Sequence, residues 1–586
     1  MRFRFFIAAI LLFVFTAAGF AREVKIQVVV TTDVHGRLFS YDFVNDRPFD
    51  ASLANVHYLL QAARTQSSNN IILLDNGDLL QGTPAAYYAN FVQDHKRNLF
   101  SRVMNLMKYD AATVGNHDIE AGPQVYNRLQ EEFAFPYLGA NVLDDQSGEP
   151  YFTPYTIIKR QGVKVAVLGL TTTGVPNWLP PHLWEGLEFQ SMVEAARYWV
   201  PYIQEHEKPD VLIGLFHSGM GPREFDPQRP EPDNASQYIA ANVPGFDVIF
   251  TGHDHRERME VVANNQGGEV LIMGAAPHAG SVAVAEITME QPSRKTFSKK
   301  KVQGELLSTK DVVPSHEYLK AFQKEVDEIL AFSSETVGTL SNDIYSIDAF
   351  YGSAPFSDLI HSVQLEVADA QISFTAPLAF NEVLKAGRLR VRDFFKLYQY
   401  ENYLYAMELT GQEVLDYLEY SYSLWLNHMQ GPDDHLLLLR QDQEGNKTFD
   451  SSGRMMLRHP YFNFDSAAGI KYTVDVSKPA GSRVHILSMS DGAAFETGKV
   501  YRVAINSYRG SGGGGHLTTG AGLTHEQISS RIVFTSQKDL RTELVNYFRQ
   551  RDQVEVKALN HWKITPELWR EQGRQKDRKA LKIEVH

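Results

Sequence analysis

Residues 24–36 read VKIQVVVTTDVHG, a run rich in β-branched residues that ends in an Asp-x-His pair. The apolar part, Val24–Val30, predicts a buried strand. Similar strands are expected at Ile71–Leu74, Lys164–Leu170, Val211–Phe216, Val248–Phe250 and Glu269–Met273. Helical patterns lie between them, at Ser52–Ala63, Asn98–Met107 and Met192–Glu205. Strands that alternate with helices predict a layered α/β structure for the first half of the chain.

Polar side chains of the metal-binding type follow four of these apolar runs and the short run Ala111–Val114. They are Asp33 and His35 after the first strand, Asp78 in Asp75-Asn76-Gly77-Asp78, Asn116 and His117 in Gly115-Asn116-His117-Asp118, His217 after Val211–Phe216, and His253 and His255 in Gly252-His253-Asp254-His255. Ligands of α/β proteins bind at this carboxyl edge of the sheet. One such cluster is more often solvated than metal-bound, but the coincidence at five strand ends predicts a shared metal site.

The residue types of these clusters indicate which metals fit. Carboxylate, amide and imidazole donors without thiolate suit zinc, manganese, cobalt, iron(II) or magnesium. Seven candidate ligands are too many for one tetrahedral ion, but they suffice for two ions that share a bridging carboxylate. Two such ions deprotonate a water and clamp the oxygens of an in-line displacement. The pattern therefore predicts two divalent metal ions and phosphoester hydrolysis.

Composition and the N-terminus set further limits. The 586 residues carry a net charge of −13 and no cysteine, which argues against binding of nucleic-acid polymers and excludes disulfides and a catalytic thiol. The N-terminus predicts a signal peptide, with a membrane anchor as the alternative. It has a basic start, Met1-Arg2-Phe3-Arg4, then the apolar run Phe5–Phe20, and the small residues Gly19 and Ala21 at the expected cleavage site. We expect an exported bacterial protein, periplasmic or secreted, that is monomeric and not stably membrane-associated after signal cleavage.

The second half of the chain mixes helices and strands. A helical pattern from Ser315 to Phe332 is expected to connect the halves, and Thr565-Pro566-Glu567 is expected to begin a charged surface helix. The domain prediction is therefore a signal peptide (1–21), a metal-binding domain (22–310), a linker helix (311–333), a C-terminal domain (334–560) and a charged helical tail (561–586).

The order Asp-x-His, Gly-Asp, Gly-Asn-His-Asp, a lone His and Gly-His-x-His resembles that of the calcineurin-like binuclear metallophosphoesterases, over about residues 24–290. The resemblance implies a four-layer α/β/β/α sandwich followed by a smaller α+β substrate-binding domain. It implies one metal held by Asp33, His35, Asp78 and His255, and a second held by Asp78, Asn116, His217 and His253. It makes His117 the catalytic histidine. The nucleotidase branch orients this histidine with an Asp where this chain has Glu120, and Asp118 is the competing partner.

The segment from about Thr336 to Asn560 resembles the C-terminal domain of secreted nucleotidases, and the whole chain resembles the 5′-nucleotidase/2′,3′-cyclic phosphodiesterase family. The resemblance implies that Tyr508 and Phe462 stack on a nucleobase, with Phe464 as the alternative core residue, and that Asn402 and Gly513 also contact substrate. The 5′-nucleotidase branch carries a phosphate-binding Arg, which Ile372–Pro377 lacks, and a base-reading Asp, which is glycine here, near Gly514.

These departures count against the 5′-nucleotidase branch. Three motifs resemble the periplasmic 2′,3′-cyclic-nucleotide 2′-phosphodiesterase/3′-nucleotidase branch: Tyr-x-Tyr-Glu-Asn-x-Leu at Tyr398–Leu404, Phe-Asn-Phe-Asp at Phe462–Asp465 and Asn-Ser-Tyr-Arg-x-x-Gly-Gly at Asn506–Gly513. The resemblance implies that the members of this branch attack the phosphorus with a metal-activated hydroxide. The alternative is a 5′-nucleotidase or UDP-sugar hydrolase with the same metal site. A hydrolase of sugars or sulfur esters would not need the two aromatic loops. A binding protein without catalysis would predict a damaged ligand set, and here every position is filled.

Overall fold

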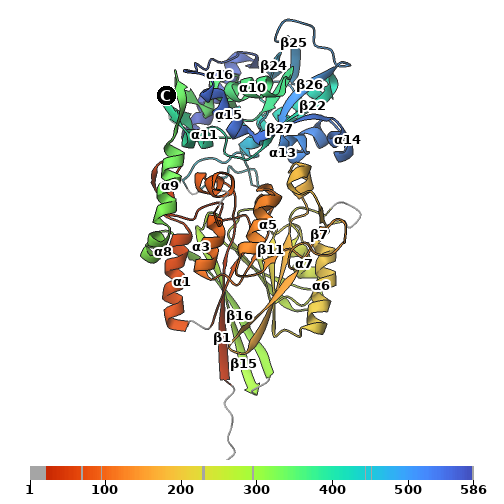
Figure 1. Cartoon of the computed structure of the whole chain (residues 1–586). Coiled ribbons are helices and arrows are strands. Elements are labelled where there is room, and N and C mark those ends of the chain that lie inside the picture. Colours follow the sequence, from red (N-terminus) through yellow and green to blue (C-terminus); the bar gives the residue numbers. More distant parts are fainter. Residues whose placement is uncertain are drawn as a thin grey trace, which may run out of the picture.

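The computed structural model describes residues 22–67, 70–93, 96–226, 231–293, 296–442, 444–450 and 452–583. The predicted signal peptide lies outside these ranges. Two domains are stacked along the long axis of the molecule, and α8 (His316–Ala321) and α9 (Gln323–Ser334) join them along one side (Figure 1). No helix within the described ranges is both long enough and apolar enough to cross a bilayer.

The N-terminal domain contains two six-stranded sheets packed face to face. The first has the order β16 (Thr296–Ser308), β15 (Ser281–Ser293), β1 (Arg22–Thr31), β4 (Ile71–Asp75), β5 (Ala111–Thr113) and β6 (Tyr137–Leu138). The second has the order β13 (Arg258–Ala263), β14 (Glu269–Gly274), β12 (Val248–Thr251), β11 (Val211–His217), β9 (Val163–Thr171) and β8 (Tyr155–Arg160). All six strands predicted from the sequence are present.

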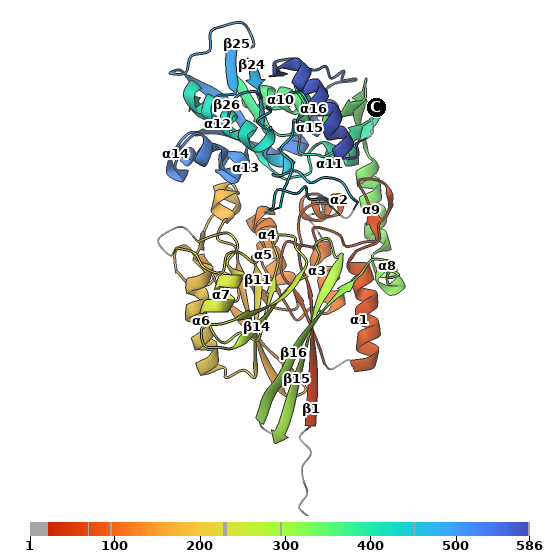
Figure 2. The ribbon, with the colours of Figure 1, turned by 180° about the vertical axis from the view of Figure 1, so that it is seen from behind.

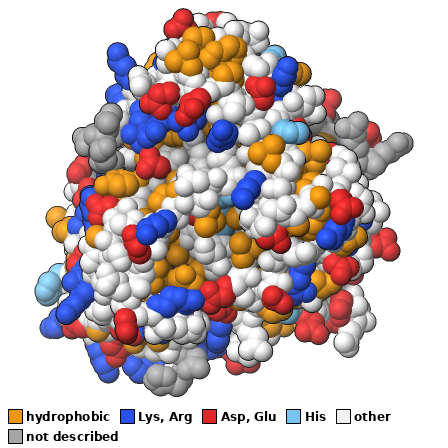
Figure 3. Space-filling model, turned by 90° about the horizontal axis from the view of Figure 1, so that it is seen from above, with side chains coloured by type: hydrophobic (Ala, Val, Ile, Leu, Met, Phe, Trp, Pro, Cys, Tyr) orange, Lys and Arg blue, Asp and Glu red, His pale blue; other side chains and the backbone are white. Residues whose placement is uncertain are grey.

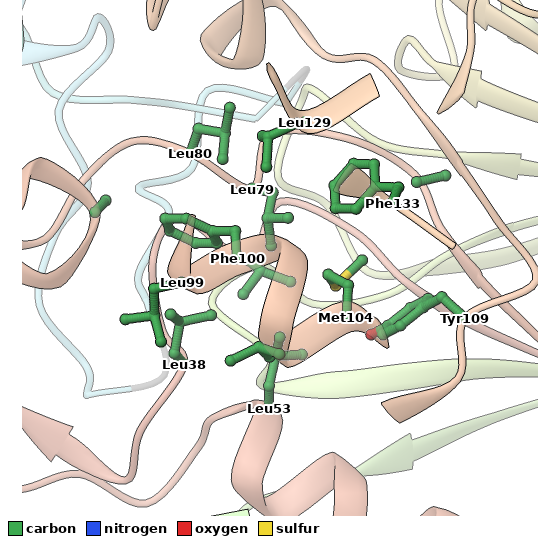
Figure 4. Close-up of a cluster of buried hydrophobic side chains, with 14 of the residues drawn as sticks. Leu38, Leu53, Leu79, Leu80, Leu99, Phe100, Met104, Tyr109, Leu129 and Phe133 are labelled. Atoms are coloured by element: carbon green, nitrogen blue, oxygen red, sulfur yellow. The ribbon is translucent and has the colours of Figure 1, made fainter. Parts of the chain in front are cut away.

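Helices cover the outer face of each sheet. The first sheet carries α1 (Leu53–Ser67), α3 (Leu99–Met107) and α5 (Pro123–Glu132), and the second carries α6 (Met192–His206) and α7 (Ser236–Asn242). Figure 4 shows apolar side chains of the first helical layer, among them Leu53, Phe100 and Leu129, meeting in a core that excludes water. Buried aliphatic side chains such as Ile26 and Leu215 fill the space between the sheets. This arrangement confirms the four-layer α/β/β/α sandwich.

Parallel pairing brings the strand ends to one edge of each sheet. Thr31 pairs with Asp75 across β1 and β4, and Phe216 pairs with Thr251 across β11 and β12. The residues that follow these strands therefore emerge side by side, which is the condition that the sequence prediction of a shared site requires.

The linker is not one continuous helix. Ser315 caps α8 by accepting a hydrogen bond from the Tyr318 amide. The helix breaks at Phe322, whose φ of −119° and ψ of 16° are not helical. The Phe322 ring is buried 5.2 Å from Tyr318 and 6.4 Å from Phe39. The Phe322 ring is buried in the N-terminal core at this break. The spacing of apolar residues is the same for a broken and an unbroken helix, so the sequence could not predict the break.

The C-terminal domain is built on a five-stranded sheet with the order β23 (Ser466–Ala468), β19 (Ile372–Thr375), β26 (Val500–Asn506), β22 (Tyr403–Thr410) and β27 (Ile532–Asp539). Helices α10 (Pro355–Ala368), α12 (Gly411–Trp425) and α15 (Leu540–Arg549) pack against it. A smaller sheet joins β25 (Val484–Met489), β24 (Ile470–Asp475) and β28 (Trp562–Thr565).

The charged C-terminal stretch is an integral part of this domain. Its helix α16 (Glu567–Ala580) begins after Pro566, and Thr565 is the last residue of β28. Asp577 is fully buried and accepts hydrogen bonds from His435 Nδ1 (2.8 Å) and the Leu437 amide (2.9 Å). Both views place α16 beside α10 and α15 (Figures 1 and 2). The Thr565-Pro566-Glu567 motif therefore predicted the helix but not its buried contacts.

The two domains also touch directly. The Tyr87 hydroxyl, at the end of α2 (Pro84–Tyr87), lies 2.7 Å from the Thr542 hydroxyl, and the Arg541 guanidinium lies 5.4 Å from the Tyr87 ring centre. Asp46 forms an ion pair of 2.7 Å with Arg392. These contacts hold the C-terminal domain over the strand ends of the N-terminal domain.

Candidate metal centre and substrate cavity

The structure brings all seven predicted metal ligands together. Asp33, His35, Asp78 and His255 offer donor atoms that lie within 4.8 Å of one another, and Asp78, His217 and His253 form a second such group. Asn116 Oδ1 adds to the second group, 2.8 Å from His253 Nδ1 and 3.1 Å from His217 Nε2. Asp78 is common to both groups, which is the position of a bridging ligand.

The backbone at these ligands is unusual. Five of them have a left-handed φ: Asp33 (49°), His35 (47°), Asp78 (56°), His253 (69°) and His255 (54°). Residues with a Cβ rarely adopt this conformation, and it persists where the surroundings fix it, as at functional sites. Here the Asp33 amide donates to the Gly77 carbonyl (2.9 Å), and the His35 amide donates to the Asp78 carbonyl (2.9 Å).

Asp118 fixes the turn that presents Asp78. Its buried carboxylate accepts hydrogen bonds from the backbone amides of Gly115 (2.8 Å), Asp78 (3.0 Å), Leu79 (2.9 Å) and Leu80 (3.2 Å). Gly115 packs so closely here that a Cβ would stand 2.3 Å from Asp78 Oδ1. The sequence does not reveal this role of Asp118.

Glu120, rather than Asp118, pairs with His117. Glu120 Oε2 lies 2.5 Å from His117 Nδ1, so the longer side chain reaches the imidazole that an Asp orients in the nucleotidase branch. The other ring nitrogen, Nε2, remains for a contact in the cavity. Burial lowers the pKa of His117, but the Asp78 and Glu120 carboxylates outweigh this effect and raise it to about 10. The imidazole therefore holds a proton at neutral pH.

The donor atoms fit divalent cations. Burial lowers the pKa of His253 to about 3 and that of His35 well below its usual range, so both imidazoles are neutral and carry a lone pair. His35 Nε2 and His255 Nε2 face each other at 2.9 Å, and His35 Nδ1 has no hydrogen-bond partner among the described residues. His217 Nδ1 donates to the Asn76 carbonyl (2.7 Å), which directs Nε2 at Asp78. Imidazole nitrogens that face buried carboxylates match the ligand set of two divalent metal ions.

A cavity of about 680 Å³ extends from this centre to the C-terminal domain. The N-terminal domain contributes Asp78, Asn116, His117, Glu120, Trp178, Leu179, Asp233, His253, Asp254 and His255, and the C-terminal domain contributes Leu378, Tyr400, Asn402, Phe462, Asn506, Tyr508 and Gly514. A ligand in this cavity reaches His117 and both aromatic loops at once.

Three of the four predicted substrate contacts line the cavity, namely Asn402, Phe462 and Tyr508. Gly513 does not line it. A Cβ there would stand 2.5 Å from the Tyr508 ring, so Gly513 lets that ring pack closely, and Gly514 faces the cavity instead. The alternative residue Phe464 is fully buried and stacks on Trp425 at 5.3 Å, as a core residue does.

A buried arginine joins the two loops that carry Phe462 and Tyr508. Arg509 is 1% exposed and lies 3.2 Å from each Asp465 oxygen. It also donates to the carbonyls of Phe462 (2.5 Å) and Gly513 (3.0 Å). Charge-assisted bonds of this kind are stronger than neutral ones, so the spacing of the loops is rigidly set.

Sequence reasoning missed several cavity residues. Trp178 stacks on the His253 ring at 5.3 Å with an angle of 20° between the planes. Tyr400 stands edge-on to Phe462 at 6.3 Å. Tyr400 belongs to the Tyr398–Leu404 pattern that also supplies Asn402, so that pattern is the signal that could have found it.

Comparison with known proteins agrees with both domains. Residues 26–257 match the model of the calcineurin-like phosphoesterase family, and residues 336–520 match that of the 5′-nucleotidase C-terminal domain. The chain is 28% identical to the trifunctional nucleotide phosphoesterase YfkN of Bacillus subtilis over 93% of its own length, but spans only 39% of that relative. It is 26% identical to a 2′,3′-cyclic-nucleotide 2′-phosphodiesterase/3′-nucleotidase of Haemophilus influenzae, covering 94% of this chain and 89% of the relative.

A further relative and a solved structure are also similar to this chain. Protein UshA of Escherichia coli is 25% identical, over 67% of this chain and 76% of its own length. A structure described as a 5′-nucleotidase of Staphylococcus aureus superposes with a TM-score of 0.74 at 20% identity, covering 92% of this chain and 100% of that one. The latter similarity supports the shared fold of both domains.

We predict that chelation abolishes phosphoesterase activity and that metal affinity depends on pH. Burial lowers the pKa of His217, but the Asp78 carboxylate outweighs this effect and raises it to about 9. A metal must therefore displace a proton at neutral pH, and affinity should rise about tenfold per pH unit between roughly pH 6 and 8. Competition titration of chelated protein with a metallochromic indicator measures this slope, and a pH-independent affinity would contradict it.

We predict that Glu120→Gln lowers kcat by about 10- to 100-fold, the usual effect of losing a carboxylate that orients a functional imidazole. The amide keeps the size of the side chain but removes the charge that faces His117 Nδ1. Glu120→Asp, which restores the charge, should recover part of the loss. Glu131→Gln, an exposed change on α5, is the matched control. Equal kcat values for Glu120→Gln and Glu131→Gln would show that the pair has no catalytic role.

Proposed function

Since the chain belongs to the calcineurin-like metallophosphoesterases that carry a 5′-nucleotidase C-terminal domain, it is a metal-dependent phosphoester hydrolase, and we propose that its substrates are 2′,3′-cyclic nucleotides and 3′-nucleotides. The observation that carries the proposal is the cavity that joins His117 to the aromatic side chains of Phe462 and Tyr508. The products are a nucleoside and phosphate.

The proposed division of roles follows from the position of each side chain. When bound, the two metal ions supply a deprotonated water and neutralise charge on the phosphoryl oxygens. Asp33, His35, Asp78 and His255 would hold one ion, and Asn116, His217 and His253, with Asp78, the other. His117 holds a proton that its Nε2 donates to the departing ribose oxygen, and Glu120 orients the ring through Nδ1.

The C-terminal domain would bind the nucleoside. Phe462 and Tyr508 come from loops whose spacing Arg509 sets, and their rings would stack on the base. Asn402 lines the same cavity and offers an amide for a polar contact. Residue 514 is glycine, so no carboxylate reads the base from this position, and base preference should be broad.

Two observations favour the 2′,3′-cyclic and 3′-nucleotide branch. The strand β19 and the residues after it, Ile372–Pro377, offer no arginine for a 5′-phosphate. The relative named for the cyclic activity also aligns over 94% of this chain, against 67% for UshA. The second candidate, a 5′-nucleotidase, retains support because the same metal ligands serve either substrate.

We also propose that the protein is exported to the periplasm or secreted, acts as a monomer and binds single nucleotides rather than polymers. Over the described residues of the end face, basic and acidic side chains are interspersed, without the continuous basic stripe that nucleic-acid polymers favour (Figure 3). The interdomain position of the cavity likewise suits a small molecule.

We predict that residues 22–586, reloaded with manganese, cobalt or zinc after chelation, hydrolyse 2′,3′-cyclic AMP and 3′-AMP much faster than 5′-AMP or UDP-glucose. The physical reason is the missing arginine at residues 372–377. Steady-state phosphate release, with a phosphomonoesterase added for the cyclic substrate and for UDP-glucose, gives kcat/KM for each. Preference for 5′-AMP would establish the second candidate, and turnover of none of them would contradict the nucleotide proposal.

We predict that Tyr508→Ala raises KM for 3′-AMP by about 5- to 100-fold with a smaller change in kcat, because one stacked base is worth roughly 1–3 kcal/mol. Phe462→Ala should act in the same direction. Methyl phosphate, which has no base, is the control substrate, and its kcat/KM should be unchanged in both variants. Equal losses for both substrates would mean that the rings support the fold of the cavity rather than the base.

A further inference from the structure

A second cavity, of about 450 Å³, lies within the C-terminal domain. It is bounded by the start of α10, by β28 and by α16, and none of its lining residues lines the substrate cavity. Three of these residues are cations, Lys563, Arg570 and Arg574, and they come from two different elements.

The charge of this cavity is positive. Asp348 is its one lining carboxylate among the described residues, and its Oδ1 is already bound by Arg578 (2.8 Å) and Arg574 (3.4 Å). Arg570 reaches the carboxylates of Glu567 and Glu571 only at 3.8 and 3.7 Å, and Arg574 reaches that of Glu571 only at 4.0 Å. Lys563 is exposed at the cavity wall. The cavity therefore attracts an anion.

The wall of the cavity also holds donors without acceptors. The Tyr351 hydroxyl, Trp562 Nε1 and Arg570 Nε are buried and have no hydrogen-bond partner among the described residues. Tyr351 and Trp562 are each only 3% exposed, and all three groups can donate a hydrogen bond. Buried polar groups are ordinarily paired, so three donors around one cavity indicate an acceptor-rich ligand.

The start of α10 adds to this field. Ala354, the N-cap, has no side chain that could accept from the first amides, and Pro355 follows at the first helical position. An uncapped helix N-terminus carries partial positive charge. The nearest buried carboxylate, Asp358, does not line the cavity, and its Oδ2 accepts from Ser353 Oγ (2.7 Å) and the Leu559 amide (2.8 Å).

The aromatic rings limit what the anion can be. One face of Trp562 stacks on Tyr472 at 5.9 Å, and Trp425 and Tyr422 contact the same indole at 5.5 and 5.4 Å. The Arg574 guanidinium lies 5.8 Å from the centre of the Tyr351 ring. The neighbours of Trp562 therefore disfavour stacking of a nucleobase here, whereas arginine forks suit the oxygens of a small tetrahedral oxyanion.

We propose that this cavity is a binding site for free orthophosphate, separate from the metal centre. The site combines Lys563, Arg570 and Arg574 with the partial positive charge at the start of α10. It would be filled by the phosphate that any phosphomonoesterase releases, so it does not rest on which nucleotide the enzyme hydrolyses.

The test is equilibrium dialysis of residues 22–586 with radiolabelled orthophosphate, with the metals in place and after chelation. The metal-loaded protein should bind phosphate at two classes of site, and the chelated protein should retain one. Lys563→Gln/Arg570→Gln should weaken the retained class at least about tenfold, because two charge-assisted contacts are lost. Lys557→Gln/Lys579→Gln, a double change at exposed lysines outside the cavity, is the matched control and should leave binding unchanged.

A second variant keeps the test independent of folding. Ala354→Asp supplies a good N-cap to α10 and places a negative charge at the cavity, so it should abolish the retained binding. Because Ala354 is only 2% exposed, Ala354→Asn, a neutral N-cap of the same size, is the matched control and should keep the binding. Loss of all binding on chelation, or equal binding by the two double variants, would overturn the proposal. Displacement of the label by 3′-AMP as readily as by orthophosphate would assign the cavity to phosphate esters and overturn it as well. Activity does not enter this readout, so its failure is distinct from failure of the proposed function.

Discussion

The whole N-terminal domain is organised around two carboxylates that are kept out of water. Asp33 and Asp78 are each 1% exposed and lie in the same cluster of donor atoms. Burial raises the pKa of Asp33. Burial also acts to raise the pKa of Asp78, but the charges of His217, His117 and His35 outweigh this effect and lower that pKa well below its usual range. Carboxylates in such surroundings are costly unless cations accompany them. The left-handed turns, the Asp118 bonds to backbone amides and the converging strand ends all serve to hold this arrangement.

The two domains divide the work of a hydrolase. The sandwich supplies rigid strand ends, and therefore a fixed set of donor atoms. The C-terminal domain supplies loops whose aromatic side chains face the same cavity, with Arg509 and Asp465 as the buried ion pair between them. Contacts such as that of Tyr87 with Thr542 hold the two domains against each other. In the proposed function, the reaction chemistry and the substrate recognition belong to domains with different hydrophobic cores.

Much of this architecture could be predicted from the sequence, because strand patterns and strand-end motifs are local signals. The six strands could be predicted from their apolar runs. The grouping of the seven candidate ligands needed in addition only the rule that parallel strands end at one edge of a sheet. What could not be predicted depends on three-dimensional packing. The break at Phe322, the buried contacts of Asp577 and the bonds of Asp118 to four amides have no local signature. Gly513 was expected to contact substrate, but it packs against the Tyr508 ring, and its neighbour Gly514 lines the cavity. Sequence alone does not show which residue of a glycine run faces a cavity.

Gly115 has a consequence for how such chains diverge. It takes no part in the chemistry, yet a Cβ at this position would stand 2.3 Å from the oxygen of the carboxylate shared by both donor groups. Any side chain would push that oxygen aside or reshape the turn around it. A homologous chain that keeps every ligand but replaces this glycine has therefore lost the shape of the centre, and counting ligands alone would misjudge it. The space left by this glycine, as much as the identity of the donor residues, therefore determines whether a homologous chain can form the same metal centre.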